Sequence, residues 1–224
     1  MYYTEKDNIV IGVDEDRERF VRTLKYTPDL KEEDIKEVPN GYIAIAGKPL
    51  ISEEDYNKEI NQAERNRLNM LSMTRGDMFE ALILSKGITK TQIRTMIEND
   101  STLDTTTKAL YLNRFDEALE FYRGYPIFDL LGDLLGITSD MLDKFFETKD
   151  YHYLTKKTLT INAVPKEAKV IIEGIEINKV TAPYGTDIEY SVELEGYTNY
   201  YGEVNLVEDK VIDVELKEVK TTEV

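Results

Sequence analysis

The spacing of apolar residues changes twice along the chain. Short β-forming runs lie at 8–13, 35–38 and 42–46, and turns that contain Pro and Gly bracket the last of them. Across 52–149 the apolar residues recur three and four positions apart, as they do on one face of a helix. After Thr158 the period becomes two, which is typical of strands with one buried face. The pattern predicts an α+β protein.

Four segments are expected from these changes of pattern. Residues 1–50 should form a short β-rich arm that covers an edge or face of the next part of the chain, because its strands are too few to bury a core of their own. Residues 51–154 are expected to form a helical domain. Residues 157–218 should form a small antiparallel β-sandwich, and residues 219–224 a short charged tail.

About six helices are expected in the helical domain, most of them short. Their starts are marked by cap residues at Ser52, Thr74, Thr89 and Thr138 or Ser139, and by Pro126 in the first turn of another helix. Three ends are marked by Gly87, Gly124 and Gly136. The run 104–123 is expected to be one continuous helix that ends at Gly124.

The sandwich should contain strands wherever apolar residues alternate with polar ones. These segments are 159–163, 170–172, 175–177, 188–192, 204–206 and 211–216. Turns that contain Gly or Pro separate several of them, and the short, regular spacing favours antiparallel pairing.

The composition and net charge exclude several classes of site and partner. The 224 residues include 28 Lys+Arg, 44 Asp+Glu, one His and no Cys or Trp, so the net charge is −16. Cys/His metal centres, disulfide scaffolds and thiol catalysis need residues that this chain lacks, and we expect neither a metal nor another cofactor. The charge argues against direct binding to nucleic acid or an anionic membrane, since phosphate contacts need cations. No membrane span and no signal peptide are expected.

Two similar turns join helices through Gly-Ile-Thr, at 87–89 and 136–138. Such a turn also precedes the recognition helix of DNA-binding helix-turn-helix proteins. The second turn is followed by Asp140, Asp143 and Glu147, where DNA would require basic and amide side chains. Packing of neighbouring helices is therefore favoured over DNA binding.

Acidic pairs in the helical domain could hold Ca²⁺ or Mg²⁺ through oxygen ligands. Asp129 and Asp133 share a helix face, as neighbours four positions apart do. No acidic group has the spacing of an EF-hand loop, so a solvated helix surface is favoured over a metal site.

The single histidine lies between the helical domain and the sandwich. His152 could act as a general base oriented by Asp150, because His is the residue most often used in that role. No nucleophile or oxyanion hole is evident beside it. We therefore expect Tyr151, His152 and Tyr153 to form an aromatic hinge between the two domains, and we assign no catalytic residue.

Tyrosines gather in the sandwich. Tyrosine provides a large contact area at a low entropic cost and is enriched in recognition surfaces. Tyr184, Tyr197, Tyr200 and Tyr201 are therefore candidate partner-binding residues. The alternative is that Tyr197 belongs to the core and the others fill a strand turn.

The C-terminal segment resembles a PEGA-type module. The resemblance is carried by 159–170 (LTINAVPKEAKV), 173–174 (EG), 182–186 (APYGT), 195–197 (EGY) and 213–216 (DVEL). PEGA-type modules are Ig-like or prealbumin-like β-sandwiches in bacterial surface proteins and tailed-phage structural proteins. The resemblance implies a non-enzymatic carrier or adhesion module and says nothing about its ligand.

The remainder is similar to small uncharacterised proteins encoded among phage tail and baseplate genes. The similar segments are 74–82, 121–124 and 145–153. The resemblance implies a phage or prophage protein that binds other proteins, foremost a virion accessory that docks by its helical part and displays the sandwich. It would be made in the host cytoplasm and, if structural, would reside in the virion. A homo-oligomer is also open.

Two other classes of function stay open. An acidic phage protein could inhibit a host defence nuclease, as anti-CRISPR proteins do, by occupying a channel built for nucleic acid. An enzyme would have to be an oxygen-liganded metal hydrolase or an acid–base catalyst that uses His152. Non-enzymatic binding to proteins is favoured, because no motif for either reaction is visible.

Overall fold

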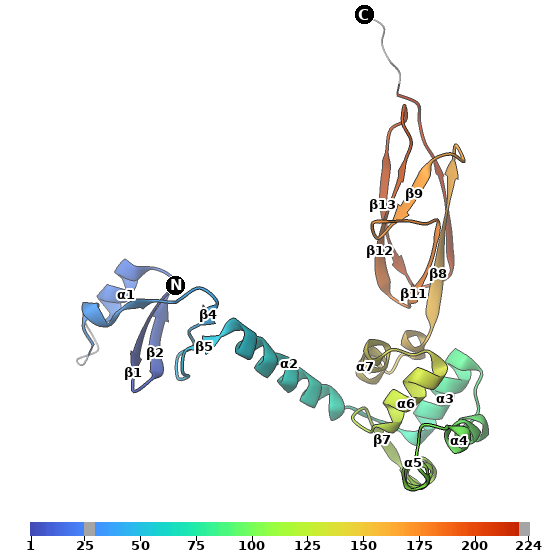
Figure 1. The fold of residues 1–224 in the computed structure, drawn as a ribbon, viewed down its shortest axis with the longest axis horizontal. Helices are drawn as coiled ribbons and strands as arrows, with labels where there is room; N and C mark the ends of the chain where they lie inside the picture. The colour runs from blue at the N-terminus through green and yellow to red at the C-terminus, as the bar shows by residue number, and fades with distance from the viewer. Residues whose placement is uncertain (25–29, 220–224) are drawn as a thin grey trace, which may run out of the picture. The chain divides into compact units, whose positions relative to one another are not determined.

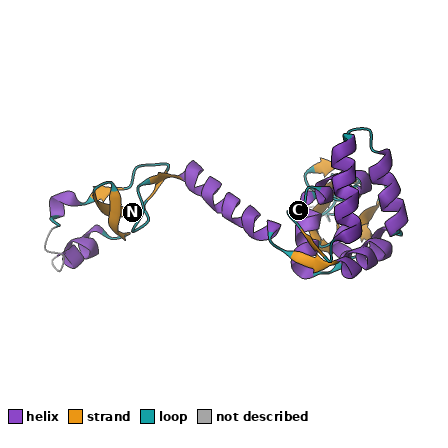
Figure 2. Cartoon of the chain, turned by 90° about the horizontal axis from the view of Figure 1, so that it is seen from below, coloured by secondary structure: helices purple, strands orange, loops and turns teal. Residues whose placement is uncertain are grey.

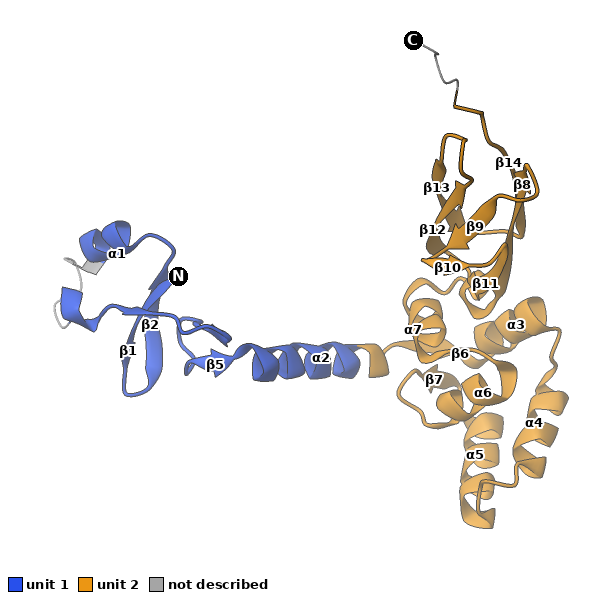
Figure 3. Ribbon diagram, turned by 45° about the horizontal axis from the view of Figure 1, so that its top comes forward, with its two compact units in different colours: residues 1–67 blue, residues 68–224 orange. Residues whose placement is uncertain are grey.

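The computed structural model describes residues 1–24 and 30–219, and it divides the chain into two compact units, residues 1–67 and 68–224 (Figure 3). The described residues form seven α-helices and 14 short strands, so the predicted α+β class is confirmed. Five of these α-helices lie entirely in the second unit. Figure 2 distinguishes the helices from the strands along the chain. The division falls within helix α2 (Glu53–Asn69), whereas the sequence pattern suggested a boundary near residue 51.

The first unit contains an antiparallel hairpin of β1 (Tyr2–Lys6) and β2 (Ile9–Asp14), and β3 (Lys36–Glu37) pairs with the other edge of β1. Asp7 and Asn8 form the hairpin turn with positive φ, which Asp and Asn tolerate better than most residues. The other elements are α1 (Arg17–Leu24), the 3₁₀-helix η1 (Glu32–Asp34), β4 (Tyr42–Ile43) and β5 (Ile51–Ser52).

The expectation that the N-terminal strands bury no core of their own is wrong. Tyr3, Val10 and Ala44 are buried together, and Val38 and Leu50 pack against them. The sequence analysis missed β1 and α1. β1 is the central strand of its sheet, with Tyr3 and Thr4 both buried, so it lacks the alternation that marks a half-exposed strand.

α2 begins after Ser52, as the cap predicts. Its interrupted apolar stripe does not form a buried face: Ile60 is half exposed, and Leu68 is the only residue of α2 that is buried. Opposite charges one turn apart, such as Glu54 and Lys58 with 2.7 Å between them, add local support to the helix.

The helical part of the second unit contains five α-helices, a two-stranded sheet and a 3₁₀-helix. The elements are β6 (Ser72–Thr74), α3 (Arg75–Lys86), α4 (Lys90–Asn99), α5 (Thr105–Glu117), β7 (Glu120–Tyr122), α6 (Ile127–Leu135), α7 (Ser139–Thr148) and η2 (Tyr151–Leu154) (Figure 1). The predicted caps are in place, since the side chains of Thr74, Thr89 and Thr138 each accept a backbone N–H of the following first turn. Asp104, which was not predicted as a cap, does the same for α5.

The continuous helix predicted over 104–123 is wrong. α5 ends at Glu117, and residues 120–122 form β7, which pairs antiparallel with β6. Phe121 lies opposite Met73 in this pair, and both side chains are buried. The spacing of the apolar residues here fits a helix or a short strand, and the pairing with β6 decides between them.

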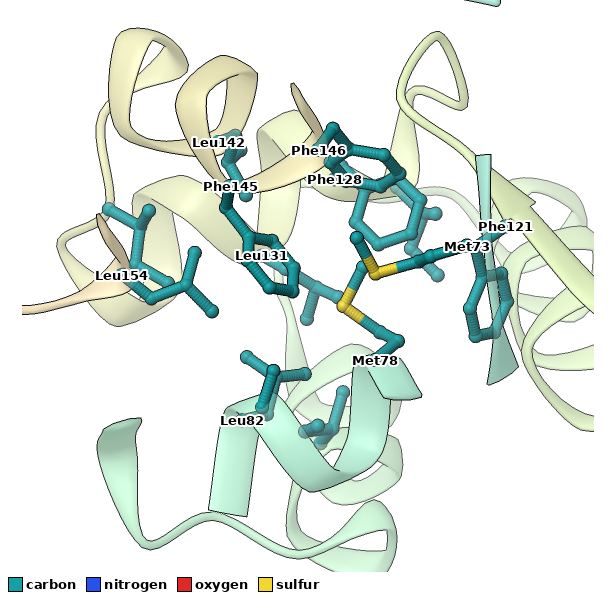
Figure 4. Packing of buried hydrophobic residues seen from close by; sticks show 14 of the residues in the cluster. Met73, Met78, Leu82, Phe121, Phe128, Leu131, Leu142, Phe145, Phe146 and Leu154 are labelled. Atoms are coloured by element: carbon teal, nitrogen blue, oxygen red, sulfur yellow. The ribbon is translucent and has the colours of Figure 1, made fainter. Parts of the chain in front are cut away.

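One apolar cluster holds the helical part together (Figure 4). The ring of Phe128 packs edge-on against Phe146 and Phe121, with centroid distances of 5.2 and 5.6 Å. Met78 of α3 lies in the same cluster. Leu154 of η2 is fully buried there, which anchors the segment before the sandwich to the helices.

Both Gly-Ile-Thr turns pack helices against this cluster. Gly87 and Gly136 adopt the left-handed conformation with φ of 65°, which ends one helix before Thr caps the next. Ile137 is buried, and Ile88 packs against the cluster. Gly132 lets α6 approach the second turn, since a Cβ there would lie 2.7 Å from the Ile137 carbonyl oxygen.

The last part of the second unit is a sandwich of two sheets (Figure 1). One sheet is antiparallel and contains, in spatial order, β10 (Ile175–Glu176), β9 (Lys169–Ile172), β12 (Thr186–Glu193) and β13 (Tyr200–Leu206). The other contains β11 (Lys179–Pro183), β8 (Lys156–Val164) and β14 (Lys210–Glu215). Apolar side chains between Leu159 and Leu216 fill the interior.

Two features of the sandwich differ from the prediction. β14 pairs parallel to β8, so the second sheet is mixed rather than antiparallel. β11 was not expected, because its sequence, KVTAP, is short and ends in proline, although Val180 and Ala182 alternate with polar residues and pack against the sandwich core. The predicted charged tail lies outside the described residues except for Val219, whose N–H donates to the Gly196 carbonyl oxygen at 2.8 Å.

Candidate functional site

The aromatic residues singled out by the sequence form two groups. The junction cluster consists of Tyr151, His152, Tyr153 and Tyr184. The sandwich tyrosines are Tyr197, Tyr200 and Tyr201. The sequence grouped Tyr184 with the sandwich tyrosines, whereas the structure places it against η2.

The rings of the junction cluster stack on one another. The centroid of the His152 ring lies 4.2 Å from that of Tyr151 and 5.2 Å from that of Tyr184, with interplanar angles of 26° and 28°. Tyr153 meets Tyr184 edge-on at 5.3 Å. The Tyr184 N–H donates to the Thr155 carbonyl oxygen at 3.1 Å. Since Tyr184 lies between β11 and β12, these contacts join η2 to the sandwich.

His152 is paired with a carboxylate. Its Nδ1 lies 2.6 Å from Oδ1 of Asp150, and the same oxygen accepts the His152 backbone N–H at 2.9 Å. Burial disfavours ionisation of Asp150, but the two hydrogen bonds outweigh it and lower the pKa of the carboxyl. In the part of the chain that the structure describes, no hydroxyl or amine hydrogen-bonds to Nε2, the atom that would activate a nucleophile.

Tyr200 and Tyr201 point to opposite faces of the antiparallel sheet, as neighbours in a strand do. Tyr200 stacks on buried Tyr190, with a centroid distance of 6.0 Å. Tyr201 lies on the outer face and is 70% exposed. Of the two, Tyr201 therefore offers more surface to a partner.

Tyr197 is largely a structural residue. Its ring packs against the sandwich core, and its hydroxyl donates to Oε1 of Glu218 at 3.2 Å. That hydrogen bond to a carboxylate raises the pKa of the phenol. The alternative interpretation, in which Tyr197 belongs to the core, fits this geometry best.

Two rows of side chains cross the outer face of the antiparallel sheet. In the first row, Tyr201, Ser191 and Ile171 lie side by side on β13, β12 and β9. In the second, Glu203 lies directly opposite Glu189.

The second row continues to Glu173, so we call Glu173, Glu189 and Glu203 the acidic row. The Glu189 N–H donates to Oε1 of Glu173 at 2.7 Å. No ion pair joins any of these glutamates to a cation among residues 1–24 and 30–219. Residues of both rows line a hollow of about 520 Å³, so Tyr201 and the acidic row form one continuous surface.

The sequence analysis missed a buried ion network in the helical part. The side chain of Arg123 is only 3% exposed. Its Nε lies 2.6 Å from Oδ1 of Asp143, its Nη1 lies 3.1 Å from Oδ1 of Asp129, and its Nη2 donates to Oγ of Ser139 at 2.6 Å. Asp143, whose side chain is 11% exposed, is therefore the partner of a buried cation. Asp129, expected on a solvated helix surface, is 67% exposed and contacts the same guanidinium from that surface.

A period-two signal was present for Arg123, because it lies two residues after buried Phe121 and so on the same side of an extended chain. The helical interpretation of this segment hid that signal.

Metal ligands do not cluster in the described ranges. No group of three or more His, Cys, Asp or Glu residues that could hold a metal ion is found there.

Comparison with known proteins finds no matching family model, no similar curated protein and no similar solved structure. None of the helices described here is long and apolar enough to cross a membrane.

Proposed function

We propose that the chain is a non-enzymatic phage or prophage protein that acts by binding other proteins, as an accessory of the virion tail or baseplate region. The helical part docks on the particle, and the sandwich presents a recognition surface. The observation that carries the proposal is the outer face of the sandwich, where exposed Tyr201 lies beside the acidic row. An exposed tyrosine among polar side chains is typical of protein-binding surfaces.

Separate packing of the sandwich supports its role as a recognition module. Its apolar cluster shares no residue with the cluster of the helical part. A surface on such a module can serve binding while the helical core keeps its own packing. The assignment to a virion rests on the PEGA-like run, because the geometry of the surface does not identify the particle to which the chain would belong.

In this proposal, His152 serves packing rather than catalysis. The rings of Tyr151 and Tyr184 stack on its imidazole, and its Nδ1 is held by Asp150. His152→Ala should therefore leave partner binding unchanged, while a loss of function at normal stability would favour the enzyme hypothesis.

Gradient purification of virions from a culture that produces the chain tests the proposal. We expect the chain to co-migrate with intact particles at a fixed ratio to a tail protein and to be absent from tailless heads. Recovery only in the soluble fraction, with expression early in infection, would contradict a virion role.

Inhibition of a host defence nuclease is the second candidate, and the acidic row favours it together with the net charge of −16. A basic nucleic-acid channel would attract such a surface. Pull-down of a Cas effector at rising salt tests this candidate, because a charge-driven complex should weaken strongly as salt screens it. Absence of any complex at low salt would remove it.

A further inference from the structure

The four edges of the sandwich are β10, β13, β11 and β14, and three of them are protected against pairing with another chain. β10 has only two residues, β11 contains Lys179 and Pro183, and β14 contains Lys210. Short strands, lysine and proline at an edge all hinder the addition of another strand.

β13 lacks these protections. It has seven residues, YYGEVNL, with neither Lys nor Pro, and it pairs with β12 in a regular register from Tyr200 to Leu206 without a bulge. Within the described ranges β13 pairs with no other strand, so its second edge has backbone N–H and C=O groups that no strand engages. One of the β13 carbonyl groups is already used, because that of Asn205 accepts the Val207 N–H at 3.1 Å.

We infer that this edge of β13 binds an extended segment of a partner protein, and that the segment carries Lys or Arg. The inference rests on the proposed function and names the partner's chemistry. Main-chain hydrogen bonds along an edge would supply affinity, and alternating side chains would supply specificity. On the outer face, the partner's residues would lie beside Tyr201 and Glu203.

The acidic row explains why the segment is basic. Like charges directly opposite each other in a sheet are unfavourable, and Glu203 faces Glu189 with no cation paired to either among the described residues. A Lys or Arg side chain from the partner would relieve that repulsion. The exposed ring of Tyr201 adds a face over which the same cation can lie.

A second copy of the chain fits the edge poorly. Two β13 strands side by side would bring two acidic rows together, and each chain carries a net charge of −16. The charge therefore favours a basic partner over self-association.

Titration of the purified full chain with synthetic peptides tests the inference, with backbone amide shifts followed by NMR. The first peptide alternates Arg and Thr over seven residues, the second has Pro in place of the central Thr, and the third has Glu in place of every Arg. We expect saturable binding of the first peptide with shifts centred on 200–206, about fivefold weaker binding of the second because a ladder hydrogen bond is lost, and none of the third.

Two charge-reversal variants distinguish an effect of the acidic row on peptide binding from an effect of the net charge of the chain. Glu203→Lys should weaken binding of the Arg-Thr peptide at least about tenfold, because it reverses the acidic row and places a lysine on the edge. Glu215→Lys, at an exposed position on β14, changes the net charge equally and should alter binding less than about twofold. Tyr201→Ala provides a second test if Glu203→Lys fails to fold.

Several results would overturn the inference: no saturable binding of the Arg-Thr peptide, equal binding of the proline peptide, equal losses in the two lysine variants, or a dimer with β13 amides protected in the free protein. Because the assay contains no virions, its failure leaves co-migration with particles intact. Conversely, peptide binding without co-migration would contradict only the virion role.

Discussion

At the scale of single residues, Arg123 makes the most consequential contacts in the helical part. Its guanidinium joins the end of β7 to α6 and α7 through Asp129, Ser139 and Asp143. A buried ion pair adds little net stability compared with apolar residues of the same shape, but removal of one partner leaves the other charge uncompensated. The network therefore determines how β7, α6 and α7 pack against one another.

Arg123→Met should lower the free energy of unfolding by about 3–5 kcal/mol, because Asp143, whose side chain is 11% exposed, loses its ion pair with Arg123. Urea unfolding followed by circular dichroism measures the change. The double variant Arg123→Met, Asp143→Leu should recover much of the loss. Equal destabilisation of the single and double variants would show that lost packing, not the lost ion pair, dominates.

Tyr190 gives the sandwich a pH dependence. Burial, and then a hydrogen bond with Tyr200, raises the pKa of its phenol to about 12. An unfolded tyrosine ionises near pH 10, so the stabilisation by neutral Tyr190 is complete below pH 10 and is lost as the pH rises towards 12.

Tyr190→Phe removes this ionisation. The difference in unfolding free energy between the natural chain and this variant should therefore be constant below pH 10 and should shift against the natural chain between pH 10 and about 12. Chemical denaturation at several pH values measures it. A difference that does not change across that interval would disagree with the buried, neutral phenol.

At the scale of elements, the features predictable from sequence are those set by local chemistry. Helix starts depend on a side chain that accepts a nearby backbone N–H, so Thr74, Thr89 and Thr138 could be identified as caps. The β7 strand depends on pairing with a segment far away in sequence, and so does the parallel pairing of β14 with β8. The spacing of apolar residues along the chain does not identify which distant segment a strand will pair with.

The candidate site likewise has some features that are set locally and others that are set by distant pairing. Alternation along a strand places Tyr200 and Tyr201 on opposite faces, which is a local property. The acidic row and the unprotected edge of β13 depend on strand register and strand order, which sequence spacing does not fix. The position of Tyr184 against His152 likewise depends on where the turn before β12 meets η2.

The packing of Tyr190 against β13 requires a glycine at position 202. The ring of Tyr190 lies across Gly202, and a Cβ there would overlap Cζ of Tyr190. Gly202→Ala should therefore displace the ring and lower the unfolding free energy by about 1–3 kcal/mol. Thermal and urea unfolding measure the effect.

Gly76→Ala is the matched control, because a Cβ there would meet nothing closer than 3.7 Å. This change lies in α3 and should be neutral or slightly stabilising. Equal losses in the two variants would refute the close contact between Tyr190 and Gly202 as the cause.

At the scale of the whole molecule, the junction cluster connects the helical core to the sandwich. Tyr184→Ala removes the ring that stacks on His152 and contacts Tyr153. Aromatic pairs of this kind contribute about 0.5–1.5 kcal/mol each, so the variant should expose the connecting segment more often. Trypsin should then cut faster at Lys149, Lys156 or Lys157.

Tyr201→Ala provides the control, because it removes an exposed tyrosine that has no contact with the junction cluster. Its cleavage rate should match that of the natural chain. If both variants are cut at the same rate, the junction cluster does not hold the connection.

The central claim is that the chain acts by binding to proteins on a virion, with His152 in a packing role. Quantitative mass spectrometry of gradient-purified virions, produced with the natural chain or with His152→Ala, tests it most directly. We predict the same fixed number of copies per tail in both preparations. Absence of the natural chain from intact, tailed particles would contradict it.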